Sequence, residues 1–127
     1  MFWHENGYYL YCMYLNLFNF TNIYKTFYIF KKPFKFWICV LLKKVPEYLE
    51  VITPIGSIKI FLRNYESLKT IYSIFCREDY KIDGKKHFFL DVGSNCGYSA
   101  IYFLTRNKDN YVECYEPDPE NYNFLKK

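Results

Sequence analysis

The chain has 127 residues, of which 51% are hydrophobic and 24% aromatic, and its formal net charge is +4. A chain of this length and hydrophobic content can bury the core of one globular domain, which excludes an intrinsically disordered protein. The net charge is small and arises from seventeen basic and thirteen acidic residues, so charge does not indicate a nucleic-acid partner.

Residues 1–45 are rich in aromatic residues and lysine. These residue types share A/T-rich codons with Asn and Ile, so a bias in nucleotide composition explains stretches such as KTFYIFKKPFKFW better than a stacking platform for single strands does. Tyr8–Phe30 is apolar enough to suggest a membrane span, but three asparagines and Lys25 interrupt it. An interfacial or buried helix is therefore predicted here, with a true membrane span as the alternative.

The cysteine and histidine content bears on metal binding and compartment. The five cysteines are odd in number and never spaced as CxxC, and the sequence has only two histidines, so neither a zinc site nor a disulfide framework is predicted. His4 and Glu5 stand where a secretory signal needs positive charge. Free thiols without a signal favour a cytoplasmic protein.

The composition changes after residue 45, which predicts a boundary between an aromatic-rich helical leader, residues 1–45, and a domain over residues 46–127. Glu47–Ile52 and Ser57–Leu62 are rich in β-branched residues and flank turn residues, so they predict a β-hairpin. Apolar residues at helical spacing then predict an amphipathic helix over Tyr65–Cys76.

From residue 87 the pattern changes to strand, loop, helix, strand, helix. Phe88–Val92 is a short run that is apolar apart from Asp91, which predicts a strand buried on both faces of a parallel sheet. Tyr98–Thr105 predicts the crossover helix and Tyr111–Tyr115 the next strand. These elements form a right-handed βαβ unit, so the predicted fold class is α/β.

A further helix is predicted at the end of the chain. Asp118 has the character of a helix N-cap, and the proline after it suits the first helical position. Tyr122 and Leu125 are expected on the buried side of this helix.

The string DVGSNCGYS, Asp91–Ser99, lies where the first βαβ strand turns into its helix. Glycine at Gly93 and Gly97 lets the backbone turn tightly and approach a ligand, and the helix N-terminus behind them offers unpaired N–H groups. Asp91 places a carboxylate at the end of the strand, where it can accept a hydrogen bond from a ligand ammonium. Glu116 follows the second strand, nineteen residues after Gly97, where doubly wound sheets present an acid to ribose hydroxyls. The predicted ligand therefore has an amino-acid end at the loop and a ribose at Glu116.

The spacing of the glycines argues against a dinucleotide as the ligand. A GxGxxG motif that begins at Gly93 needs glycine where Asn95 and Tyr98 stand, and the phosphate-binding pattern GxxxxGK[ST] is absent from the sequence. The acid-x-Gly-xxx-Gly arrangement followed by a later acid fits S-adenosylmethionine better than NAD.

FLDVGSNCGYSAIYF followed by YVECYEPDPENYNFLKK resembles the FkbM family of methyltransferases, whose typical pattern is DVGANIGxxS/T and then a strand ending in EPxPxxxxxL. The resemblance covers roughly Tyr48 to Lys127, and Ser94 and Cys96 depart from the usual loop residues. It implies an incomplete Rossmann-like class I methyltransferase fold. Because such enzymes continue through several more strands, the chain is expected to be an N-terminal portion that is inactive by itself.

Carried over by position, the resemblance implies a cofactor site for S-adenosylmethionine. Asp91, Gly93 and Gly97 would hold the methionine portion and Glu116 the ribose, with Asn95 and Ser99 as further contacts. The implied reaction is O-methylation of a sugar or another hydroxyl-bearing metabolite. Its general base cannot be assigned to any residue, and no metal is implied.

Each of these residues also has a structural interpretation. Asp91 could cap the helix, and Glu116 could be a surface acid before a turn. Cys96 and Cys114 are expected to be core residues, while Tyr80 is expected either to line the cofactor pocket or to pack. A second class of function also stays open: a non-enzymatic remnant or a membrane-associated binding module in which the aromatic leader matters.

Overall fold

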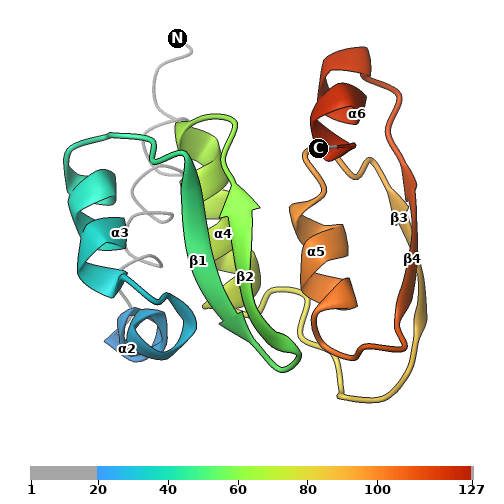
Figure 1. Ribbon diagram of the computed structural model, residues 1–127, viewed down its shortest axis with the longest axis horizontal. Helices are drawn as coiled ribbons and strands as arrows, with labels where there is room; N and C mark the ends of the chain where they lie inside the picture. The colour runs from blue at the N-terminus through green and yellow to red at the C-terminus, as the bar shows by residue number, and fades with distance from the viewer. Residues whose placement is uncertain (1–19, 127) are drawn as a thin grey trace, which may run out of the picture.

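The computed structural model describes residues 20–126, in which five helices and two two-stranded sheets form a mixed α/β domain (Figure 1). The elements in chain order are α2 (Phe20–Ile29), α3 (Pro33–Leu41), β1 (Tyr48–Thr53), β2 (Gly56–Phe61), α4 (Tyr65–Phe75), β3 (Phe88–Val92), α5 (Tyr98–Leu104), β4 (Tyr111–Tyr115) and α6 (Pro119–Leu125). Most of the apolar segment Tyr8–Phe30 lies outside the described residues. No helix within residues 20–126 is long and apolar enough to cross a membrane.

The predicted hairpin is confirmed, with β1 and β2 antiparallel and Thr53 opposite Gly56 at the turn. The free edge of β1 is covered by the leader, because Phe30 forms a bridge with Val51 and the amide of Lys31 donates to the carbonyl oxygen of Glu50 at 3.0 Å. The start of the described chain is thus joined directly to the hairpin.

One hydrophobic core holds the leader, the hairpin and α4 together. Phe36 of α3 stacks on Phe30 at 4.5 Å between ring centroids and on Tyr72 of α4 at 6.0 Å. Val51 of β1 and Leu68 of α4 are fully buried in the same cluster. The division at residues 45 and 46 stays a prediction, but residues on both sides of it contribute to this core.

Helix α4 forms as its sequence predicts. Asn64 is its N-cap and accepts a hydrogen bond from the amide of Ser67, while the Ser67 side chain accepts from the amide of Asn64, which completes a capping box. At the other end, Lys25 of α2 forms an ion pair with Glu78 at 2.7 Å, and this hydrogen bond holds the pKa of the Glu78 carboxyl below its usual value. Both ends of α4 are therefore anchored.

The β3–α5–β4 unit is parallel, as predicted, with Asp91 opposite Cys114. The expectation that β3 is buried on both faces is wrong for the described chain: Phe88, Leu90 and Val92 are 64%, 59% and 75% exposed. Among the described elements α5 covers only the other face, where Phe89 stacks on Phe103 at 4.2 Å (Figure 1).

The last helix begins as predicted, because Asp118 accepts a hydrogen bond from the amide of Asn121 and Pro119 occupies the first turn. The predicted burial of Tyr122 is wrong: its ring is exposed and lies under the ammonium group of Lys126. Phe124 packs against the core, and Leu125 lies against Gly97. Both are only half-buried, so the predicted burial of Leu125 is confirmed in part.

Candidate functional site

The loop between β3 and α5 is shaped by three left-handed residues. Gly93, Asn95 and Gly97 have φ values of +79°, +50° and +78°. The amides of Gly93 and Ser94 both donate to the carbonyl oxygen of Tyr115, at 2.8 and 3.2 Å, so the loop is tied to the end of β4. These two bonds restrict the loop, and a restricted loop loses less conformational entropy when a ligand binds.

Asp91 lies at the carboxyl end of β3 and is partly exposed. One of its oxygens accepts a hydrogen bond from the Ser99 hydroxyl at 2.6 Å. The predicted contacts Asp91 and Ser99 are therefore brought together, with Ser99 orienting the carboxylate. A carboxylate offers about four acceptor positions, so Asp91 retains acceptor capacity for a ligand cation.

Glu116 is brought to the same loop from the end of β4. Its carboxylate accepts from the amide of Asn95 at 2.6 Å and from the amide of Asp118 at 2.9 Å. These bonds hold the carboxylate beside the loop and leave one acceptor position on each oxygen. Glu116 is thus more than a surface acid before a turn, because it supports the left-handed conformation of Asn95.

The two glycines of the loop have different surroundings. A Cβ atom at Gly93 would have no heavy atom within 4 Å, whereas one at Gly97 would lie 2.5 Å from Cδ1 of Leu125. Gly97 therefore permits the close approach of α6 to the start of α5. Gly93 has an open environment in which a ligand can approach the backbone.

This difference yields a stability prediction. Gly93→Ala and Gly97→Ala should each lower the free energy of unfolding by about 1–2 kcal/mol, because alanine is strained in the left-handed conformation. Gly97→Ala should cost more, because the Leu125 side chain must also move. Urea unfolding measures both. The excess should shrink when Gly97→Ala is combined with Leu125→Ala. Equal costs for both glycines in the native background would contradict a cost of moving the Leu125 side chain.

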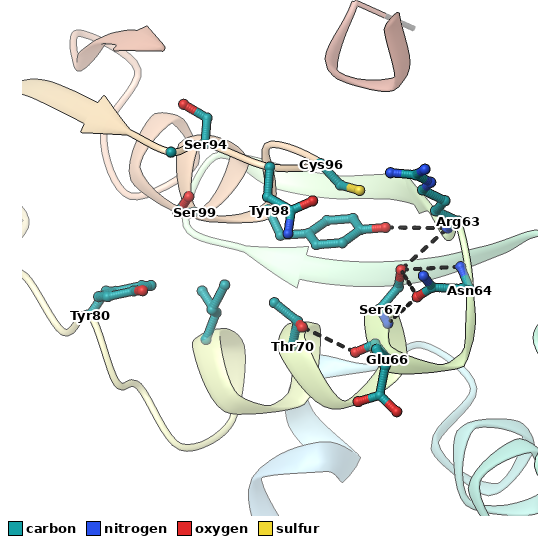
Figure 2. Close-up of a pocket in the computed structure, with 13 residues that line it drawn as sticks. Arg63, Asn64, Glu66, Ser67, Thr70, Tyr80, Ser94, Cys96, Tyr98 and Ser99 are labelled. Atoms are coloured by element: carbon teal, nitrogen blue, oxygen red, sulfur yellow. Dashed lines mark hydrogen bonds between the residues drawn. The ribbon is translucent and has the colours of Figure 1, made fainter. Parts of the chain in front are cut away.

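A pocket of about 280 Å³ lies between this loop and α4 (Figure 2). One wall is the loop itself, from Gly93 to Cys96, together with Tyr98 and Ser99. The opposite wall comes from the chain before and within α4, with the side chains of Asn64, Ser67 and Thr70, and Tyr80 lies at one end. Tyr80 thus lines this pocket, and its ring also packs on Phe103 at 5.9 Å, while its place in a cofactor pocket stays a prediction.

Asp91 and Glu116 do not line this pocket. Their carboxylates flank the loop, whereas the pocket opens on its α4 side. A bound ligand that contacts both carboxylates and also occupies the pocket must therefore lie along the loop.

Tyr98 holds the two walls together. Its hydroxyl donates to the carbonyl oxygen of Phe61 at 3.2 Å. The same hydroxyl accepts from the amide of Arg63 at 3.3 Å (Figure 2). Burial raises the pKa of Tyr98, so the hydroxyl stays protonated at neutral pH and can donate. This role could not be predicted from the sequence, because Tyr98 has the spacing of an ordinary apolar helix residue.

Arg63 is a second residue that the sequence analysis missed. Its guanidinium forms an ion pair with Glu120 of α6 at 2.7 Å and a hydrogen bond with Asn121, while the residue also lines the pocket. Among the residues that line this pocket, Arg63 alone carries a positive charge. In the sequence, the one feature that could have indicated this role is the position of Arg63 directly before Asn64, the N-cap of α4.

In comparisons with known proteins, no family model, curated protein or solved structure matches this chain.

Proposed function

We propose that this chain binds S-adenosylmethionine at the loop after β3 and forms the cofactor-binding portion of a methyltransferase. The observation that carries the proposal is the convergence of Asp91 and Glu116, from the carboxyl ends of two adjacent parallel strands, on one loop of left-handed residues. In open α/β sheets this edge is where ligands bind. On this proposal β3–α5–β4 is the opening of a Rossmann-like sheet of the class I methyltransferase type.

The chemistry of the residues fits the proposed ligand. Asp91 can accept from the ammonium group of the methionine portion, and the free acceptor positions of Glu116 can take the ribose hydroxyls. Gly93 leaves room for the ligand to lie against the backbone. When bound, S-adenosylmethionine supplies a methyl group on a positively charged sulfur.

The acceptor side is proposed from the pocket. Its α4 wall carries the side-chain amide of Asn64 and the hydroxyls of Ser67 and Thr70, which suits a polar acceptor with hydroxyl groups. The Ser67 hydroxyl already bonds to Asn64 and to the amide of Arg63, so it is expected to shape the pocket. Methyl transfer would then depend chiefly on positioning of the acceptor oxygen.

The proposal predicts ligand choice. Glu116→Gln should weaken S-adenosylmethionine binding about five- to ten-fold, because a charged acceptor becomes neutral, and NAD should not compete. Calorimetric titration measures both affinities.

Glu113→Gln is the matched control, since Glu113 lies on the same strand and its carboxylate bonds to Tyr115 rather than to the loop. Equal losses in the two variants, or competition by NAD at concentrations similar to those of S-adenosylmethionine, would refute the assigned site.

A further inference from the structure

Helix α3 is apolar on two opposite sides. Phe36 and Cys39 enter the core, whereas Phe34, Ile38 and Leu41 are 71%, 54% and 75% exposed. The exposed residues are spaced by four and three positions, so they form one stripe along the helix. The opposite side of α3 packs in the core, whereas this stripe is exposed in the part of the chain that the structure describes.

Helix α2 extends the stripe. Tyr24, Phe27 and Tyr28 are exposed on α2, and the Phe27 ring lies 5.4 Å from that of Phe34 on α3. The rings of Tyr24 and Tyr28 lie 4.7 Å apart. The α2–α3 apolar surface is defined here as Tyr24, Phe27, Tyr28, Phe34, Ile38 and Leu41.

The chain segment that carries this surface contains charges of one sign. Residues 20–46 contain six lysines and no acidic residue. Lys25 pairs with Glu78, and two others lie beside Glu50. Lys35, Lys43 and Lys44 are exposed and form no ion pair within residues 20–126.

We infer that the α2–α3 apolar surface docks on a membrane that contains anionic lipids, with its aromatic and aliphatic side chains in the headgroup region and its lysines on the lipid phosphates. An apolar face beside lysines is the composition of interfacial helices, and each lysine near an anionic surface adds about 1 kcal/mol. Tyrosine suits the boundary between lipid and water because one end of its ring is polar.

A protein partner fits this surface less well. The buried centres of protein interfaces are depleted in lysine. In a symmetric dimer through this surface, the lysines of one copy would face those of the other, and like charges repel. Figure 1 shows α2 and α3 on one side of the hairpin and the β3–α5–β4 unit on the other, so the inference is independent of the proposed cofactor site.

The test is co-sedimentation of the full chain with phosphatidylcholine vesicles, with and without about a third phosphatidylserine. Binding is expected only to the anionic vesicles, and it should weaken as salt is added. Lys43→Gln with Lys44→Gln should weaken binding about thirty-fold, from two lysines at about 1 kcal/mol each. Ile38→Ser with Leu41→Ser should weaken it about ten-fold or more.

Two control pairs match these changes elsewhere on the surface. Lys85→Gln with Lys86→Gln removes the same charge, and Leu90→Ser with Val92→Ser changes residues that are 59% and 75% exposed. Both should bind within about two-fold of the native chain. Absence of binding to anionic vesicles, equal losses in the controls, or a dimer in light scattering that Ile38→Ser with Leu41→Ser dissociates would overturn the inference.

Discussion

Phe36→Ala is expected to lower the free energy of unfolding by about 3–5 kcal/mol, the usual loss for a buried aromatic ring. Phe36 is 2% exposed and its ring lies between those of Phe30 and Tyr72. The substitution therefore leaves a cavity where the leader, the hairpin and α4 meet. Because a domain of this size is stable by only about 5–15 kcal/mol, much of its stability would be lost.

Phe34→Ala is the matched control, since Phe34 lies on the same helix but is 71% exposed. Its cost should stay within about 0.5–1 kcal/mol, with the contact to Phe27 as the main loss. Denaturant unfolding measures both variants. Similar costs would mean that α3 does not pack on the domain, and that the leader is a separate unit.

Asp91→Ala is expected to weaken S-adenosylmethionine binding about ten- to hundred-fold, because a hydrogen bond between charged groups contributes about 1.5–3 kcal/mol. The fold should persist, since Asp91 is partly exposed and its side-chain partner is the Ser99 hydroxyl. Ser99→Ala should have a smaller effect, because it removes only the group that orients the carboxylate.

Asp109→Ala makes the same change in charge in the exposed turn between α5 and β4, at the opposite end of the unit from the loop. Calorimetry should give native affinity for this control. If Asp91→Ala also retained native affinity, Asp91 would not be a contact of S-adenosylmethionine.

The parts of the fold that depend on local sequence could be predicted. The turn at Thr53 to Gly56 brings two β-branched segments together, and the N-cap at Asp118 with its proline fixes the start of α6. The βαβ unit could be predicted because Phe88–Val92 and Tyr111–Tyr115, each with a single acid among apolar residues, have the length of strands and flank a helical segment. The loop at residues 93–97 could also be predicted, since its two glycines lie between a strand and a helix.

The pocket could not be predicted, because it depends on contacts between segments far apart in the chain. Tyr98 bonds to Phe61 and Arg63 across more than thirty residues, and no local pattern marks such a partner. The burial of β3 was overestimated for a related reason. An apolar run indicates which faces can be buried, but the neighbouring elements decide which face is covered.

Binding of S-adenosylmethionine to the loop after β3 can be observed residue by residue if the isotope-labelled chain is titrated with this compound and its backbone amide signals are followed by NMR. The largest shifts are predicted at Gly93, Asn95 and Glu116, with little change at the hairpin turn. NAD at the same concentration should leave these signals in place. Absence of shifts at the loop, or the same shifts with NAD, would show that the loop does not bind S-adenosylmethionine selectively.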